Sequence, residues 1–132
     1  MIQPGRRILI VDPDTGTAEE FRAMFRAKSY DVEVCKGLTD AVMILRNAKF
    51  GCVVMDVELP ELMGYEAVPI LRAIEPSLAV ILTTASNTKE IENRARREGI
   101  HYYYIKSFDR KELEQAVDSL FQAGAKLRRV PS

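Results

Sequence analysis

The sequence predicts an α/β domain with a parallel β-sheet that is covered by helices on both faces. Short runs of β-type residues alternate along the chain with segments of helical period. Three of these runs are apolar throughout, as expected for strands that are buried on both faces of a parallel sheet. The chain has 132 residues, which is enough for one domain with a substantial core and too few for two.

Five strands are expected, each only a few residues long. The segment Val32-Glu33-Val34 alternates between apolar and charged residues, which favours a place at the edge of the sheet. The expected strands cover residues 8–11, 32–34, 52–55, 79–82 and 102–105.

The segments between the strands carry apolar residues at helical spacing. The pattern is clearest near the C-terminus, where one stripe is formed by Leu113, Ala116, Val117, Leu120 and Phe121. Shorter stripes of the same kind are formed by Ala18, Phe21, Met24 and Phe25, by Leu38, Ala41, Val42 and Leu45, and by Ile91 with Ala95.

Local signals mark the ends of three helices. Asp109 with Glu112 three residues later predicts the N-terminal cap of the last helix, and Asn87 with Glu90 predicts the cap of the preceding one. The helix expected at about residues 65–74 contains Pro69, which lacks a hydrogen-bond donor. A late start or a kink is therefore expected in that helix.

Alternating strands and helices imply right-handed crossovers between parallel strands. The expected arrangement is the flavodoxin-like doubly wound sheet with strand order 2-1-3-4-5 and five helices. In such a sheet the functional site forms at the carboxyl ends of the strands, where the strand order reverses. Here that position lies between the first and third strands.

The composition excludes several classes of function. Lys+Arg and Asp+Glu both total 19, so bulk electrostatic binding to nucleic acid or membrane is not expected. No apolar run approaches the roughly 20 residues that span a bilayer, and the N-terminus has no secretory pattern. Cys35 and Cys52 lie in or beside strand-like segments and are expected to be buried reduced thiols. These observations predict a cytoplasmic protein with one domain over residues 1–124 and a short tail, or the start of a linker, over 125–132.

Polar residues follow four of the expected strands. Asp12 ends the first strand, Asp56 the third and Thr83-Thr84 the fourth, and Lys106 follows the fifth. Each residue alone has a common structural role, but together they form a coherent chemical set. A carboxylate can be a nucleophile toward phosphorus, a hard cation such as Mg²⁺ relieves repulsion between two carboxylates, and a lysine binds phosphate oxygens.

Four segments of the chain resemble bacterial response-regulator receiver domains, and the resemblance covers about residues 6–124. The run RILIVD at 7–12 is similar to the first strand of that family, and MDVELPELMG at 55–64 resembles its phosphoacceptor segment. The run ILTTA at 81–85 resembles its switch segment, and YYIKSF at 103–108 resembles the segment with the switch aromatic and the lysine. All four occur in the family order and spacing.

The resemblance implies a role for each matching residue. Asp56 would accept a phosphoryl group from a histidine kinase or phosphotransfer protein, and Lys106 would pair with Asp56 and then with the phosphate. Asp12, Asp56 and the backbone carbonyl of Glu58 would hold Mg²⁺. Such a protein is a phosphoacceptor switch that could catalyse its own phosphorylation and dephosphorylation, and it is not a classical enzyme.

The resemblance also implies a switch and a contact surface. Thr84 and Tyr103 would be the coupled switch residues. They would change the face made by the fourth helix, the fifth strand and the fifth helix, which is the usual site of dimerisation or output contact in the family. Arg94, Arg96 and Arg97 on the fourth helix are expected either to belong to that contact face or to be simply solvated.

Three residues raise questions about the site. Pro13 stands where the family usually has a second acid, so weakened Mg²⁺ binding is expected. Asp14 could substitute for the missing acid, but its more favoured role is as a helix cap. Ser107 stands where the family usually has a proline after a cis bond, so either a trans bond with a displaced Lys106 or a strained cis bond is expected. The side chain of Glu58 could add charge at the mouth of the site or point into solvent.

The sequence is also compatible with two alternative functions. Pro13 and Ser107 are compatible with a receiver-like interaction module that does not depend on phosphorylation. Asp12-Pro13-Asp14 also resembles the start of haloacid-dehalogenase-type phosphatases, in which Asp12 would be the nucleophile and Asp14 the acid/base. That reading leaves the segment from Asp56 to Gly64 unexplained.

Overall fold

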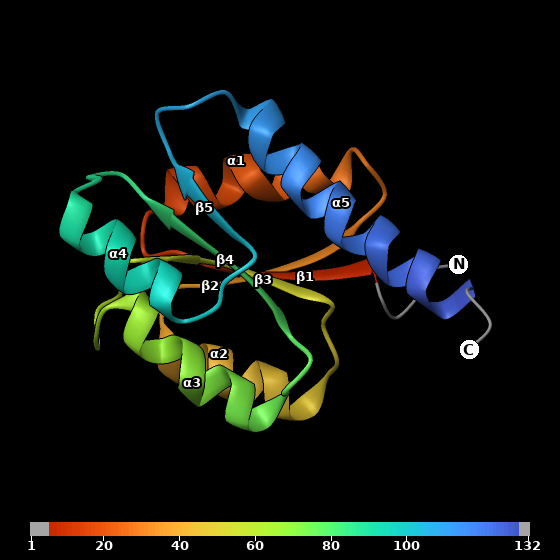
Figure 1. Ribbon diagram of the computed structural model, residues 1–132, viewed down its shortest axis with the longest axis horizontal. Coiled ribbons are helices and arrows are strands. Elements are labelled where there is room, and N and C mark those ends of the chain that lie inside the picture. Colours follow the sequence, from red (N-terminus) through yellow and green to blue (C-terminus); the bar gives the residue numbers. More distant parts are fainter. Residues whose placement is uncertain (1–5, 130–132) are drawn as a thin grey trace.

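The computed structural model describes residues 6–129, with side chains up to residue 122. A five-stranded parallel sheet lies at the centre, with α2, α3 and α4 on one face and α1 and α5 on the other (Figure 1). The strands are β1 (Arg7–Val11), β2 (Asp31–Cys35), β3 (Cys52–Asp56), β4 (Ala79–Thr84) and β5 (Tyr102–Ile105). The helices are α1 (Thr15–Arg26), α2 (Leu38–Asn47), α3 (Gly64–Ile74), α4 (Lys89–Arg97) and α5 (Arg110–Arg129).

The strand order is β2-β1-β3-β4-β5, and every pair is parallel. This confirms the predicted fold class, including the reversal of strand order between β1 and β3. In the register, Val11 pairs with Met55 and Asp56 with Thr83, so the carboxyl ends of β1, β3 and β4 reach the same edge of the sheet. The residues that follow these strands are therefore brought close together.

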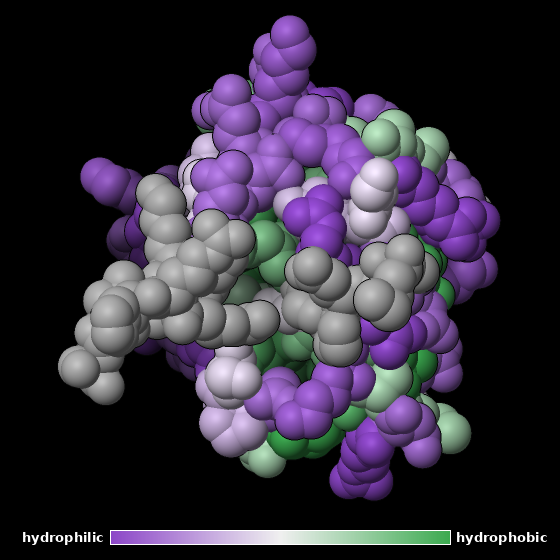
Figure 2. Space-filling model, turned by 90° about the vertical axis from the view of Figure 1, so that its right-hand side faces the viewer, coloured by the Kyte–Doolittle hydropathy of each residue, from purple (hydrophilic) through white to green (hydrophobic). Residues whose placement is uncertain are grey.

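Side chains alternate along the strands between two core layers. The layer beneath α2, α3 and α4 contains Leu9, Val11, Met55 and Leu82, whereas the layer beneath α1 and α5 contains Ile8, Ile10, Val54 and Ile81. β1 and β3 are almost wholly buried, which explains why their sequences are apolar without alternation. Hydrophilic side chains cover most of the end of the molecule where β1 begins, with hydrophobic ones visible between them (Figure 2).

The cap predicted for the fourth helix is wrong by one residue. Thr88 is the N-cap of α4, and its hydroxyl accepts a hydrogen bond from the Ile91 amide at 3.1 Å. Asn87 instead accepts a hydrogen bond from the Tyr103 hydroxyl. Both residues are favourable caps by type, and the tertiary contact of Asn87 decides between them.

A late start or a kink was expected in α3, and of these the late start is wrong. The helix begins at Gly64, where the Glu66 side chain accepts a hydrogen bond from the Met63 amide at 3.1 Å, and it continues past Pro69 to Ile74. A proline inside a helix removes the hydrogen bond to the carbonyl four residues earlier. The buried apolar face of α3, which includes Val68 and Leu71, compensates for that loss.

The cap predicted for α5 is confirmed, because Asp109 Oδ1 accepts a hydrogen bond from the Lys111 amide at 2.9 Å. The helix then runs to Arg129, so it continues into the segment predicted as a tail. Alanine, leucine, lysine and arginine are strong helix formers, which accounts for the extension; residues 130–132 lie outside the described part. None of the described helices combines the length and apolarity that a membrane span requires.

Candidate functional site

Four polar residues meet at the carboxyl edge of the sheet. Asp12 directly follows β1, Asp56 and Thr84 are the last residues of β3 and β4, and Lys106 directly follows β5. Backbone hydrogen bonds continue the sheet ladder across two of these positions: the Asp12 amide donates to the Cys35 carbonyl at 3.0 Å, and the Lys106 amide donates to the Thr84 carbonyl at 2.8 Å. The sheet itself therefore fixes the backbone from which the site side chains project.

Lys106 lies between the two carboxylates. Its Nζ is 2.9 Å from Asp12 Oδ2 and 3.4 Å from Asp56 Oδ2, and its side chain is only 10% exposed. Asp12 is 2% exposed and Asp56 7%, so two acids and one ammonium share a largely dry site. Two close carboxylates repel each other, and the lysine relieves part of that repulsion.

The environment of Asp56 disfavours its charged form. Burial raises the pKa of this carboxyl above its ordinary value, and the neighbouring Asp12 raises it further, whereas Lys106 acts in the opposite direction. The net shift is upward, so one lysine does not fully compensate two buried acids. An additional cation at this edge would favour the ionised, nucleophilic form of Asp56.

The oxygen atoms at this edge fit a hard divalent cation. The approach of Lys106 to Asp12 Oδ2 does not form a hydrogen bond, and this buried oxygen has no other partner in the described part of the chain. Mg²⁺ prefers carboxylate and carbonyl oxygens and is commonly held by one or two carboxylates with several waters. Asp12, Asp56 and the Glu58 carbonyl would supply such ligands, although the described residues contain no group of three acids, histidines or cysteines arranged around a metal position.

Asp14 is held by α1 and does not join the two acids. Its Oδ1 accepts a hydrogen bond from the Gly16 amide at 3.1 Å, and its Oδ2 accepts one from the Thr17 hydroxyl at 2.9 Å. The bond from Thr17 is the main reason that the pKa of Asp14 lies below its ordinary value. The geometry thus favours the helix-cap role, and Pro13 leaves the neighbouring position without a ligand atom.

The two predicted switch residues lie under α4. Thr84 is completely buried, and its hydroxyl accepts a hydrogen bond from the Ser86 amide at 3.1 Å. The Tyr103 ring is turned inward with 7% exposure, and its hydroxyl donates to Asn87 Oδ1 at 2.7 Å. Burial is the main reason that the pKa of Tyr103 lies above its ordinary value, and the Glu92 charge raises it further, whereas the Arg96 charge acts in the opposite direction. Thr84 and Tyr103 lie on the neighbouring strands β4 and β5.

The loop after Asp56 requires glycine at its end. The Gly64 amide donates to the Val57 carbonyl at 2.6 Å, and a Cβ at Gly64 would lie 2.4 Å from the Asp56 carbonyl oxygen. The side chain of Glu58 is exposed, and its backbone forms an isolated bridge with Met63. The Glu58 side chain therefore points into solvent, while its backbone is held beside the site.

Sequence reasoning missed a contact that anchors the same loop. Glu61 accepts hydrogen bonds from the Leu38 amide at 2.9 Å and the Thr39 amide at 3.1 Å, so its carboxylate caps α2. These two bonds lower the pKa of Glu61. A Cβ at Gly37 would lie 2.6 Å from Glu61 Oε1, so the glycine makes room for the cap. No local signal could reveal this pairing, because its partners are more than twenty residues apart.

Sequence reasoning also missed Arg110 and the buried hydroxyl of Thr83. The described residues contain no cis peptide bond, so Lys106-Ser107 is trans, and Arg110 donates to the Lys106 carbonyl at 2.6 Å. Thr83 pairs with Asp56 in the sheet and is fully buried, yet its hydroxyl has no hydrogen-bond partner in the described part. Thr83 and Thr84 are successive residues of β4, so their side chains face opposite sides of the sheet.

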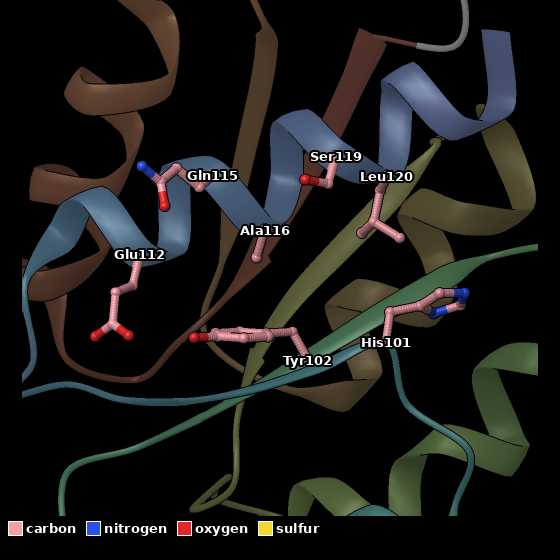
Figure 3. A pocket seen from close by; sticks show the side chains of 7 residues that line it. All are labelled: His101, Tyr102, Glu112, Gln115, Ala116, Ser119 and Leu120. Atoms are coloured by element: carbon pink, nitrogen blue, oxygen red, sulfur yellow. The ribbon is translucent and has the colours of Figure 1, made fainter. Parts of the chain in front are cut away.

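A separate pocket of about 490 Å³ lies between β5 and α5. Figure 3 shows the Tyr102 ring beneath Ala116 and beside Glu112, with His101 and Leu120 farther along. The pocket contains none of the residues that meet at Asp56. It lies between two elements of the face that was predicted for partner contact. On α4, the third element of that face, Arg96 forms an ion pair with Glu92.

The chain belongs to the response-regulator receiver family, because its residues 8–118 match the model of the response regulator receiver domain. The transcriptional regulatory protein ZraR of Salmonella typhimurium is 30% identical over 131 residues, which cover 96% of this chain and 30% of ZraR. This chain therefore spans less than a third of that relative.

Solved structures agree with the fold. The signal receiver domain of an HD domain-containing protein from Pseudomonas fluorescens Pf-5 has a TM-score of 0.87 at 21% identity, covering 98% of this chain and 97% of that one. A CheY-like receiver domain protein from Methanospirillum hungatei JF-1 has a TM-score of 0.85 at 22% identity, covering 92% and 98%. Receiver domains are phosphorylation-dependent signalling switches of two-component systems; they generally bind Mg²⁺, interact with histidine kinases or phosphotransfer proteins and can dimerise.

Proposed function

We propose that Asp56 is the phosphoacceptor of this receiver domain. A carboxylate oxygen of Asp56 attacks the phosphorus of a phosphohistidine, a P–O bond forms, and the P–N bond to the imidazole breaks. The leaving imidazole takes up a proton, and Asp56 becomes an acyl phosphate. The observation that carries the proposal is the ion-paired arrangement of buried Asp56, buried Asp12 and Lys106 at one edge of the sheet.

Lys106 and Asp12 prepare the site for this transfer. The lysine is close enough to Asp56 to move from the carboxylate to the oxygens of an arriving phosphoryl group. Asp12, Asp56 and the Glu58 carbonyl would hold Mg²⁺, which neutralises the charge of the phosphoryl group when it is bound. The loss of an acid at Pro13 predicts weaker binding of this cation than in a site with two adjacent acids.

Phosphorylation is expected to reach the surface through Thr84 and Tyr103. When Asp56 carries phosphate, the Thr84 hydroxyl leaves the Ser86 amide and donates to a phosphoryl oxygen. The space released beside Tyr103 then changes its position under α4, which alters the face made by α4, β5 and α5. That face is proposed to contact a second copy of the domain or an output protein.

The partners follow from this chemistry. The phosphodonor is proposed to be a histidine kinase or phosphotransfer protein, and the balanced charge of the chain gives no reason to propose direct contact with nucleic acid or membrane. Because ZraR is a transcriptional regulatory protein and is much longer, an output region outside this sequence is a further proposal.

Incubation with acetyl phosphate and Mg²⁺, followed by intact-mass measurement, tests the assignment. The expected result is a mass gain of one phosphoryl group, which is absent in Asp56→Asn and is removed when Mg²⁺ is chelated. Asp14→Asn is the control, because that carboxylate caps α1 and should not be required. Failure to obtain the adduct even at high Mg²⁺ would refute the proposal.

A second candidate is an interaction module that works without phosphorylation. Two observations favour it: Pro13 offers no ligand atom, and Lys106 already lies between the two acids. Under this reading the chain binds its partner equally well as wild type and as Asp56→Asn, and acetyl phosphate does not change the affinity. The phosphatase reading has no such support, because the chain belongs to the receiver family and Asp14 is committed to α1.

A further inference from the structure

Arg110, at the start of α5, is the most extensively bonded side chain near the site. Its Nε donates to Glu20 Oε2 at 2.7 Å and its Nη2 to Glu20 Oε1 at 3.2 Å. Its Nη1 donates to the Lys106 carbonyl at 2.6 Å and to the Tyr104 hydroxyl at 3.0 Å. The guanidinium also lies 5.0 Å from the centre of the Phe21 ring. One side chain thus joins α1, β5 and the loop after β5.

The loop after β5 has few other constraints. The Lys106-Ser107 bond is trans and is not followed by a proline, so the covalent chain does not stiffen this turn. Apart from the Asp109 cap of α5, the described bonds within the turn are one from the Phe108 amide to the Ile105 carbonyl at 2.9 Å and one from the Tyr104 hydroxyl to the Phe108 carbonyl at 2.6 Å. Residues 107–109 are exposed and therefore gain little from packing.

Lys106 is held from both sides of its backbone. Its amide donates to the Thr84 carbonyl at 2.8 Å, which is the last bond of the sheet, and its carbonyl accepts from Arg110 at 2.6 Å. The side chain must reach across to two carboxylates at 2.9 and 3.4 Å. A shift of the carbonyl would rotate the Lys106 backbone and carry the ammonium away from one of them.

We propose that Arg110, fixed by Glu20 and Tyr104, is a positioning residue that holds Lys106 against Asp12 and Asp56. The inference rests on the proposed phosphoacceptor function, because it explains how the lysine of that site is placed. Arginine suits the role because its planar guanidinium can donate hydrogen bonds to a carboxylate and a carbonyl at the same time and at fixed angles. The single ammonium group of a lysine has no such fixed arrangement of donors. The Glu20 side chain is half exposed, so the ion pair adds little to stability and acts mainly through placement.

The first measurement does not depend on phosphorylation. The Lys106 Nζ resonance is followed by ¹H–¹⁵N NMR in wild type, Arg110→Gln and Arg110→Lys, with the assignment made by its loss in Lys106→Gln. A buried, ion-paired ammonium exchanges slowly and gives a distinct signal in wild type. That signal is expected to disappear or to move to the position of exposed lysines in both Arg110 variants.

The second measurement is the rate of phosphorylation by acetyl phosphate and Mg²⁺. A misplacement of about 1 Å near the reacting atoms can cost on the order of 100-fold in rate, so a loss of at least about tenfold is expected for Arg110→Gln. Arg22→Gln is the matched control, because Arg22 forms a similar ion pair with Glu19 on α1 but does not touch the loop after β5. Arg22→Gln should leave both the rate and the Lys106 signal unchanged.

Glu20→Gln and Tyr104→Phe test the same prediction independently if the Arg110 variants fold poorly. Each substitution removes one hydrogen-bond partner of Arg110, so each should weaken the Lys106 signal and lower the phosphorylation rate. Combining either substitution with Arg110→Gln should add no further loss, because both act through the same contact. An unchanged Lys106 signal in all these variants would overturn the positioning role, whatever happens to the rate. If the Arg110 variants lose the Lys106 signal but the wild type accepts no phosphoryl group, the positioning role is retained and the proposed function is refuted.

Discussion

Pro13 lies beside Asp12, one of the residues proposed to hold Mg²⁺. Next to it, Asp12 offers a buried oxygen without a hydrogen-bond partner, while Asp14 is occupied by its two bonds to α1. The site therefore has the charge of two acids rather than three close to the expected cation. Mg²⁺ affinity depends strongly on the number of charged ligands, so a single substitution here should have a clear effect.

Pro13→Asp is expected to bind Mg²⁺ severalfold more tightly than wild type, because it adds a carboxylate beside Asp12. Isothermal titration calorimetry with Mg²⁺ alone measures the effect. Pro76→Asp is the control, since it adds the same charge on an exposed position before β4, at the opposite edge of the sheet. Equal affinity of Pro13→Asp and wild type would show that the position is not oriented toward the metal.

Asp56 should reduce stability at neutral pH when no metal is present. Its folded-state pKa is raised, chiefly by burial, so the favourable protonated form is lost as the pH rises through that value. Asp56→Asn should therefore unfold at higher urea concentration than wild type at pH 7 in the presence of a chelator. The difference should vanish as the pH falls below the ordinary value of 3.8. Lower stability of Asp56→Asn at pH 7 would mean that its pairing with Lys106 outweighs the cost of burial.

At the scale of elements, the loop between β3 and α3 shows what the sequence could and could not predict. The spacing from Asp56 to Gly64 was readable as a family pattern, but its physical reason is the close approach of Gly64 to the Asp56 carbonyl. The cap that Glu61 places on α2 was unreadable, because it depends on how two distant segments fold against each other. Local patterns predict which elements form, whereas contacts between elements need the folded chain.

Gly64→Ala should destabilise the domain by about 1–3 kcal/mol, the usual cost of overpacking. The new Cβ would lie 2.4 Å from a backbone oxygen, which cannot move without shifting Asp56. Chemical denaturation measures the loss, and acetyl phosphate labelling should slow in parallel. Gly16→Ala is the control, because its Cβ would meet Asp14 Oδ1 at an ordinary 3.5 Å. Equal stability of Gly64→Ala and wild type would contradict the close approach.

At the scale of the whole molecule, a polar cluster ties the C-terminal helix to the segment before β2. Asp118 on α5 accepts a hydrogen bond from the Tyr30 hydroxyl at 2.6 Å and forms an ion pair with Lys28. The Tyr30 ring packs against Phe121, and its centre is 5.1 Å from that of Phe121. These contacts attach α5 to the segment before β2, although the two are far apart in the sequence.

Asp118→Asn should lower stability at pH 7, and the loss should shrink in acid. Burial raises the pKa of Asp118, but the bonds from Lys28 and Tyr30 outweigh it and the net shift is downward. A lowered folded-state pKa adds stability above the ordinary value of 3.8, and that stability is lost as the pH falls through the folded-state value. Urea unfolding from pH 7 to pH 3 measures this, with the exposed Asp40→Asn as control. A loss that is independent of pH would show that the charge of Asp118 is not involved.

The sequence alone determined the strand order, the alternation of elements and the identity of the four residues that meet at the sheet edge. Hydrophobic periodicity is a local property, and the handedness of crossovers then fixes the topology. Only the tertiary structure decided that Glu61 caps α2, that Lys106 lies between two acids with a trans bond after it, and that Arg110 donates to the Lys106 carbonyl. Those outcomes depend on contacts between segments that are far apart in the sequence, and no local pattern carries that information.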